Sequence, residues 1–320
     1  MKKLVFTIIF IVLVASANSY SAPLKRQSVS ADAKWIMHVD FDAFRSSTIG
    51  SLVLGEIKAK HQLQMEALKK LFGSNPADDL FSLTVYGPDA DERNAVALIS
   101  GNFDKSKLLS VLQLNPAYDS DEYEGTSIYF WQDEKSKKDQ VGAFASDDLI
   151  VISQSRSAVQ SALDVIRGDA PSLTDSGDLP LDLPAVSDVQ PIFLAASNHL
   201  AELTKNKEHA AILQNSRLMA ILAAEEEGDT IFRIHLTAQT PEAAMQIEQV
   251  VRGMMSFGML NAANQPALSE ILTAVTLTRS ESILDLQFSY PSADLFEVLK
   301  SLKEQHDQSP SEEQDEKPAQ

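Results

Sequence analysis

The chain of 320 residues contains no cysteine, which excludes disulfide bonds, thiolate nucleophiles and zinc sites built on cysteine. Glycine is scarce, with 12 residues, and nowhere has the spacing of a phosphate-binding loop. The motifs HExxH, GxSxG and GxGxxG do not occur. Because a catalytic triad is defined in space, a hydrolase or other enzyme with a site not visible in sequence stays an alternative. The sequence favours a protein that is not an enzyme and has no cofactor.

Positive charge is also in short supply. Lysine and arginine total 27 against 45 acidic residues, which gives a formal net charge of −18. A strongly acidic chain is repelled by the phosphates of nucleic acids and by anionic membrane surfaces. We therefore expect no nucleic-acid partner.

Long apolar runs are absent except in Leu4–Val14. Lys2 and Lys3 precede this run, and Ala15-Ser16-Ala17 supplies the small residues that signal peptidase needs. The run is shorter than the roughly 20 residues that span a bilayer. These features predict a signal peptide over residues 1–17, cleaved to leave Asn18 or alternatively Pro23 at the N-terminus. The mature protein is then periplasmic or extracellular and has no stable membrane span.

The remainder of the chain repeats itself. Strands predicted at 82–87 and 95–103, followed by a helix at 105–114, recur about 135 residues later. The matching elements are strands at 217–222 and 231–238 and a helix that begins at Pro241, with Thr240 as its cap.

Further elements repeat in the same order. A strand at 149–155 and a helix at 155–166 match a strand at 283–289 and a helix at 292–303. The opening strand at 35–44 resembles 191–200. In the first half a longer helix at 49–72 and additional strands at 126–132 and 141–145 are predicted, where the second half has 273–278.

This pattern predicts an α+β fold with two pseudo-repeated halves, each an antiparallel or mixed sheet with helices packed on one face. The expected organisation is a signal peptide (1–17), a flexible N-terminal segment (18–33), a first half (34–167), a linker (168–190), a second half (191–304) and a disordered acidic tail (305–320).

Two segments carry a family resemblance. WIMHVDFDAF and VGAFASDDLIVISQSRSAVQSALDVIRGDAPSL resemble parts of uncharacterised exported bacterial proteins with a repeated α+β pattern and no assigned activity. The resemblance implies the same fold and carries over no catalytic or binding residue.

His38, Asp40 and Asp42 form the sharpest local cluster of polar residues. Residues two apart in a strand share a face, so the three side chains could bind a divalent metal. We favour a solvent-facing strand surface without a further ligand, with Asp42 capping the turn that follows. The other histidines have no ligand spacing, and the acidic runs 119–124 and 225–229 lack the EF-hand pattern, so we predict no metal site and treat both runs as solvated loops.

Two apolar segments remain as candidates for binding. The helix at 49–72 has one apolar and one basic face, a pattern that can bind a membrane or an acidic partner but is more typical of a helix packed on a core. Met254, Met255 and Met259 with Phe257 are adaptable apolar side chains that fill a core or line a groove at the junction of the halves. We therefore expect the partner to be an unknown envelope protein or an apolar ligand.

Overall fold

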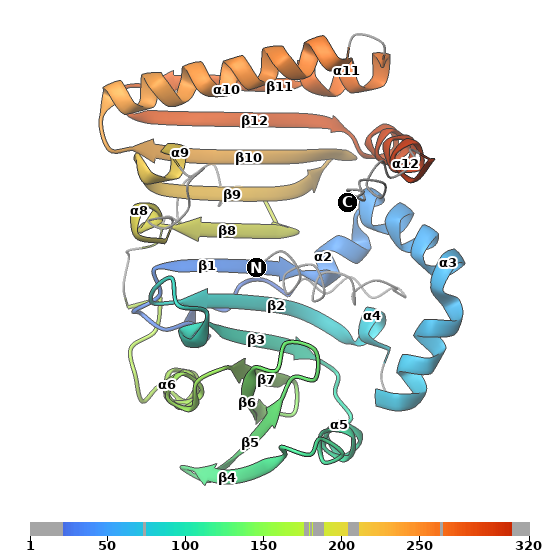
Figure 1. Ribbon diagram of the computed structural model, residues 1–320, viewed down its shortest axis with the longest axis vertical. Coiled ribbons are helices and arrows are strands. Elements are labelled where there is room, and N and C mark those ends of the chain that lie inside the picture. The colour runs from blue at the N-terminus through green and yellow to red at the C-terminus, as the bar shows by residue number, and fades with distance from the viewer. Residues whose placement is uncertain are drawn as a thin grey trace, which may run out of the picture.

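The structure is a computed structural model that describes residues 22–72, 75–175, 179, 181, 189–203, 211–262 and 265–308. The predicted signal peptide therefore lies outside the described residues. Within them, twelve strands form one antiparallel sheet in the order β11-β12-β10-β9-β8-β1-β2-β3-β7-β6-β5-β4 (Figure 1). The predicted α+β fold class is confirmed.

The strands span β1 (Trp35–Asp40), β2 (Leu80–Gly87), β3 (Val96–Gly101), β4 (Asp119–Tyr123), β5 (Thr126–Gln132), β6 (Asp139–Ser146), β7 (Leu149–Ser153), β8 (Phe193–Ser197), β9 (Ser216–Glu226), β10 (Asp229–Ala238), β11 (Val275–Ser280) and β12 (Ile283–Pro291). The helices span η1 (Arg26–Ser28), α2 (Phe41–Ser46), α3 (Thr48–Phe72), α4 (Pro76–Asp79), η2 (Glu92–Asn94), α5 (Lys105–Leu112), α6 (Arg156–Arg167), α8 (Leu200–Leu203), α9 (Ala211–Gln214), α10 (Pro241–Asn261), α11 (Pro266–Thr273) and α12 (Ser292–Gln308).

The two halves of the repeat share this single sheet and do not form separate ones. Strands β1 and β8 pair at its centre, with Trp35 opposite Ser197 and Val39 opposite Phe193. Outward from this pair, the first half continues β2-β3-β7-β6 and the second half continues β9-β10-β12-β11. The repeated strands therefore occupy equivalent positions, and β5 and β4 extend the first half at one edge.

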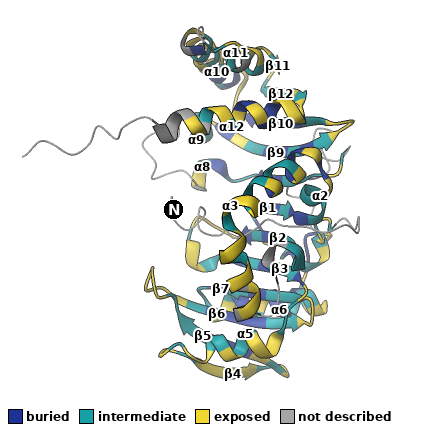
Figure 2. Ribbon diagram, turned by 90° about the vertical axis from the view of Figure 1, so that its right-hand side faces the viewer, coloured by how far each residue is buried: buried dark blue, intermediate teal, exposed yellow. Residues whose placement is uncertain are grey.

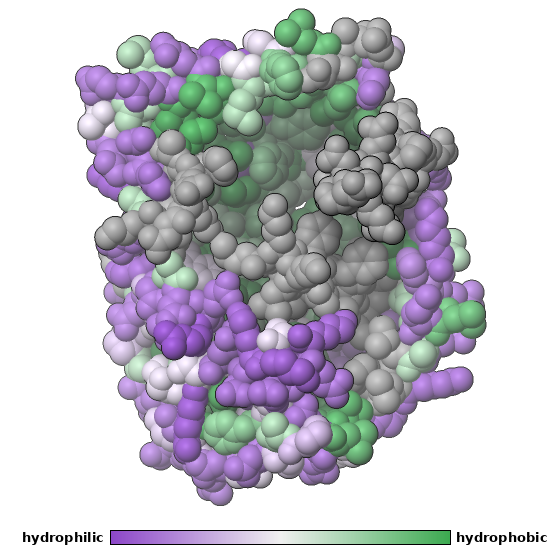
Figure 3. All heavy atoms as spheres, in the orientation of Figure 1, coloured by the Kyte–Doolittle hydropathy of each residue, from purple (hydrophilic) through white to green (hydrophobic). Residues whose placement is uncertain are grey.

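The sheet has two faces of different character. One face, here called the His38 face, carries Ile36 and His38 and is covered by α6 and by residues 22–33, so it holds the larger buried core. The opposite face, here called the Met37 face, carries α5 and α10. Its apolar side chains Met37 and Val39 are only half-buried. Figure 2 shows how burial is distributed over the elements, and in Figure 3 hydrophobic residues gather in a hollow below α10.

Several predicted boundaries were wrong. Residues 22–33 are not flexible within the described range, because Val29 and Ala33 are buried on the His38 face. The opening strand ends at Asp40, where the carboxylate accepts the backbone N–H of Ala43 and so begins α2. The acidic run at 119–123 is an edge strand, β4, and not a loop. Helix α12 continues through residues 305–308, which we expected to be disordered.

Parts of the predicted linker contribute to the core. Leu173, Leu179 and Leu181 are buried beside residues 22–33, and Ser172 bridges to Ser30. The remaining described residues of 168–190 connect α6 to β8. None of the described helices is both long enough and apolar enough to cross a bilayer.

Candidate apolar binding cleft

Helix α5 stands away from the sheet that it faces. Asp104 caps its beginning by accepting the backbone N–H of Lys107 at 3.0 Å. Leucine and valine side chains of α5 face the sheet, but no residue of the helix is buried. An apolar helix face normally packs against its sheet. The incomplete burial of α5 therefore indicates unfilled space beneath it.

Aromatic side chains of β5 and β6 form the floor of this space. Tyr129 and Phe144 meet edge to face with ring centroids 6.2 Å apart. Trp131 lies over Gly142, where an added Cβ would approach the indole ring to 3.0 Å. Glycine at this position therefore leaves room for the indole ring.

The space between α5 and this floor is a cleft of about 750 Å³. Its volume falls within the roughly 300–1,000 Å³ that is usual for small-molecule sites. The lining residues are mainly apolar: Leu108, Leu109, Val111, Leu112, Leu114, Tyr129, Trp131, Ala143, Phe144, Ile150 and Ile152, with Asn115, Gln132, Asp133, Glu134, Lys135 and Gly142 completing it. Leu114 is 80% exposed, so an apolar side chain extends into solvent next to the cleft.

The second half of the repeat provides an internal comparison. Helix α10 has the place that corresponds to α5, and it packs directly on the Met37 face. Ala244 and Ile247 of α10 are buried against Leu236 and Leu284. On the corresponding part of the first half the sheet presents the rings of Tyr129, Trp131 and Phe144, and no residue of α5 is buried against them.

The two ends of the cleft differ in polarity. At the C-terminal end of α5, Asn115 donates its Nδ2 to the carbonyl of Gln132 at 2.8 Å, which ties the helix to β5. At the N-terminal end, the Lys105 ammonium lies 5.0 Å from the centroid of the Phe144 ring. One charged residue therefore contacts the apolar floor directly.

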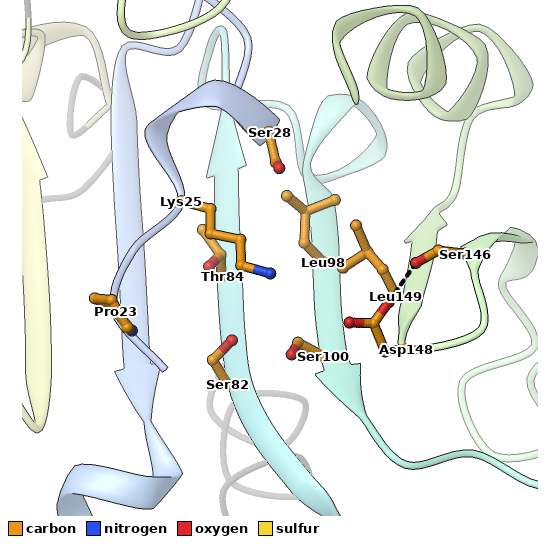
Figure 4. Close-up of a pocket in the computed structure, with 10 residues that line it drawn as sticks. All are labelled: Pro23, Lys25, Ser28, Ser82, Thr84, Leu98, Ser100, Ser146, Asp148 and Leu149. Carbon is orange, nitrogen blue, oxygen red and sulfur yellow. Dashed lines mark hydrogen bonds between the residues drawn. The ribbon is translucent and has the colours of Figure 1, made fainter. Parts of the chain in front are cut away.

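A second cavity lies on the His38 face under residues 23–28 and has a volume of about 90 Å³ (Figure 4). Lys25 points into it, and hydroxyl groups of β2 and β3, including those of Ser82 and Ser100, line it. At its margin Ser146 donates to Asp148 at 2.6 Å. This volume has room for a few water molecules or a small polar group.

The predicted solvent exposure of His38 and Asp40 was wrong. Their side chains are 1% and 0% exposed, because β1 is a central strand and residues 22–33 cover it. Asp40, and not Asp42, caps the next helix, and its other oxygen accepts the N–H of Ala22 and the amide of Gln190, both at 3.0 Å. Asp42 instead pairs with Arg45. Both carboxylates are therefore engaged in interactions within the fold, Asp40 in hydrogen bonds and Asp42 in an ion pair.

His38 also has a structural partner, since its Nδ1 lies 2.9 Å from Thr84 Oγ1. Burial lowers the pKa of His38 to about 4, so the imidazole is neutral at physiological pH. In the part of the chain that is described, no group of three or more histidine, aspartate or glutamate residues could hold a metal ion.

The methionines of α10 do not lie at the junction of the halves, which excludes a groove at the junction, one of the two alternatives for these residues. The junction is the β1–β8 pair, whereas α10 packs on β10, β11 and β12 at one edge of the sheet. Met254 and Phe257 are each 66% exposed, while Met255 is half-buried. The helix at 49–72 was predicted to pack on a core; this helix, α3, packs against α12, and Glu56 pairs with Lys300 at 2.9 Å.

The cleft under α5 was not predicted from the sequence. The strand SIYFWQ and the segment GAF carry the aromatic residues that form its floor. This concentration of aromatic residues was the available signal. Its significance depends on the distance between helix and sheet, which the sequence pattern does not give.

Comparison with known proteins shows a similarity of fold only. No family model and no curated protein matches the chain. Three crystal forms of TP0453 are similar in structure, each at 10% sequence identity. Form III has a TM-score of 0.48 and covers 89% of this chain and 99% of its own. Forms I and IV each have a TM-score of 0.45, and cover 90% and 88% of this chain and 98% and 97% of their own.

Proposed function

We propose that this is an exported, non-enzymatic protein that binds a small apolar molecule in the cleft between α5 and strands β5–β7. The observation that carries the proposal is the apolar space of about 750 Å³ beneath a helix that buries none of its residues. Export rests on the signal-peptide pattern at the beginning of the sequence.

The energetics of the cleft support a ligand. Each Å² of apolar surface removed from water contributes roughly 25 cal/mol. In the free protein the side chains of Trp131, Phe144 and Ile152 are only half-buried, so an apolar molecule that filled the cleft would complete their burial. The equivalent helix α10 gains this burial from the protein itself, and α5 does not.

The other features fit binding better than catalysis. No histidine or serine lines the cleft, its charged lining residues lie in the segment 133–135 at one end, and Lys105 contacts its floor at the other. The smaller cavity near Lys25 and Asp148 has hydroxyl groups but space only for a small polar group. An envelope protein as a partner stays a prediction from the sequence.

Tryptophan fluorescence tests the proposal directly, because Trp131 lines the cleft and Trp35 is the only other tryptophan. In a Trp35→Phe background, titration of the mature protein with dodecanol should shift the emission of Trp131 in a saturable way. A Leu112→Glu variant places a charge in the cleft and should weaken binding at least tenfold. It should remain folded because α5 buries no residue.

Met254→Glu on α10 is the matched control, since it also places a carboxylate on an apolar helix but away from the cleft. It should bind dodecanol as the parent does. If Met254→Glu abolishes binding while Leu112→Glu retains it, the site is on α10 and the proposal for the cleft is wrong. If no variant shows a saturable change, the proposed function is wrong.

A further inference from the structure

We infer that the ligand of the cleft is a single-chain amphiphile with an anionic head group, which lies against Lys105 while its tail extends along the aromatic floor toward Trp131. The inference rests on the proposed function and adds the chemistry and the orientation of the ligand. It follows from the unequal charge at the two ends of the cleft.

Lys105 is the available cation at the N-terminal end of α5. Its ammonium contacts the Phe144 ring, and among the described residues it forms no ion pair. The neighbouring carboxylate of Asp104 is already engaged, since it caps α5 and pairs with the Lys107 ammonium at 3.5 Å. In a protein with a net charge of −18, an unpaired lysine beside an apolar cleft favours an anion there.

Acidic residues outnumber basic ones in the lining at the opposite end of the cleft. Asp133 and Glu134 lie there with a single lysine, Lys135. Hydrogen bonds from the Ser136 hydroxyl and from its backbone N–H, the latter at 2.6 Å, lower the pKa of the Asp133 carboxyl and keep it charged. An anionic head group is therefore expected at the Lys105 end and the alkyl chain at the Trp131 end.

The cleft suits one alkyl chain. Helix α5 has eight residues and a length of about 12 Å at the usual rise per residue. Between Phe144 and Trp131 the floor is aromatic, and α5 supplies leucine and valine side chains above it. The side chains of α5 that line this path are apolar, and an alkyl chain has no polar group that would need a hydrogen bond from them.

The test compares four probes of equal chain length in the Trp35→Phe background: laurate, dodecyl phosphate, dodecanol and methyl laurate, each below the concentration at which it forms micelles. Binding is followed by the emission of Trp131. The two anions should bind about fivefold more tightly than the two neutral probes, as expected for one partly exposed ion pair. A higher affinity for laurate assigns a fatty carboxylate, and a higher affinity for dodecyl phosphate assigns a phosphate head group.

Substitutions at two neighbouring lysines locate the head group. Lys105→Gln should abolish the preference for anions, and Lys105→Arg should retain it. Lys107→Gln, at the lysine that pairs with Asp104, should leave the preference unchanged. Equal affinity for charged and neutral probes, or a preference that survives Lys105→Gln, overturns this inference but leaves the apolar binding function intact. Failure of all four probes to bind contradicts the proposed function itself.

Discussion

The carboxylate of Glu225 accepts the backbone N–H of Thr48 at 2.7 Å, so a strand of the second half caps a helix of the first. The same carboxylate accepts the N–H of Ile49 at 3.0 Å and the hydroxyl of Ser292 at 2.7 Å. The first N–H groups of an α-helix have no partner within the helix, and Glu225 satisfies two of them in α3. One side chain thus connects β9, α3 and α12.

Removal of this carboxylate should destabilise the whole molecule. We expect Glu225→Ala to lower the free energy of unfolding by about 1–2 kcal/mol, the usual effect of losing a helix cap. Glu225→Gln retains one acceptor oxygen and should lower the free energy of unfolding by less than Glu225→Ala does. Urea unfolding followed by circular dichroism measures both, and an Ala variant as stable as the parent contradicts the expectation.

The same residue should make stability depend on pH. Burial by itself raises the pKa of the Glu225 carboxyl, but hydrogen bonds from Thr48, Ser292 and Ile49 outweigh it and hold the pKa below its ordinary value of 4.5. The contribution is therefore complete above pH 4.5 and is lost as pH falls through the lower pKa of the folded protein. The Glu225→Gln variant should not show this loss of stability at low pH, because the amide does not titrate.

His38 should produce a second pH dependence over a higher range. Its pKa falls from 6.5 to about 4 on burial, so below pH 6.5 the unfolded chain binds a proton that the folded protein does not. Stability should decline by about 3 kcal/mol between pH 6.5 and 4. His38→Gln should reduce this decline, measured by urea unfolding at each pH, with His199→Gln as the matched control. An unchanged decline in the His38 variant would show that other groups cause it.

Adjacent methionines of α10 should respond differently to a charge. Met255 is half-buried, so Met255→Glu should lower the free energy of unfolding by about 1–3 kcal/mol. Met254 is 66% exposed, and Met254→Glu should change stability by no more than about 0.5 kcal/mol. Thermal unfolding of the two variants separates them, and equal effects would contradict the orientation of α10.

Gly142 should be required for the position of Trp131. In Gly142→Ala the new Cβ would lie 3.0 Å from the indole ring, so the ring must move. We expect the free energy of unfolding to fall by about 1–2 kcal/mol and the fluorescence emission of Trp131 to change. Gly55→Ala is the control, since a Cβ there meets nothing within 4 Å and alanine favours a helix. Unchanged emission in Gly142→Ala would place the indole elsewhere.

The mature N-terminus should be Asn18. Cleavage there retains Ala22, whose N–H donates to Asp40 at 3.0 Å, whereas cleavage before Pro23 removes Ala22 and this hydrogen bond with it. Intact-mass measurement of protein recovered from the cell envelope or medium distinguishes the two. A chain that retains Met1 would contradict cleavage.

The sequence pattern was sufficient for most of the strands and for their succession along the chain, because alternating apolar residues and the repeat offset can be read from the sequence. It was insufficient for burial. The polar positions of WIMHVD alternate as they would on a solvated face, yet residues 22–33 cover His38 and Asp40. This covering is a long-range contact that alternation alone does not reveal.

The cleft shows the same limit. The helix predicted at 105–114, which the structure ends at Leu112, and the aromatic strand at 126–132 were both expected, but the space between them depends on how closely the helix approaches the sheet. The edge strand β4 was missed because DSDEY has no apolar alternation. Its acidic side chains suit a strand whose outer edge must not pair with another chain.

The central β1–β8 pair affects when the sheet can close during synthesis of the chain. β1 is synthesised shortly before β2 and can pair with it at once, but its other edge waits until residues 193–197 have been made. During that interval the first half presents an open strand edge in the middle of the future sheet, the kind of edge that captures neighbouring chains. The second half covers this edge only once β8 has been made, so a chain truncated after residue 167 should aggregate where the complete chain does not.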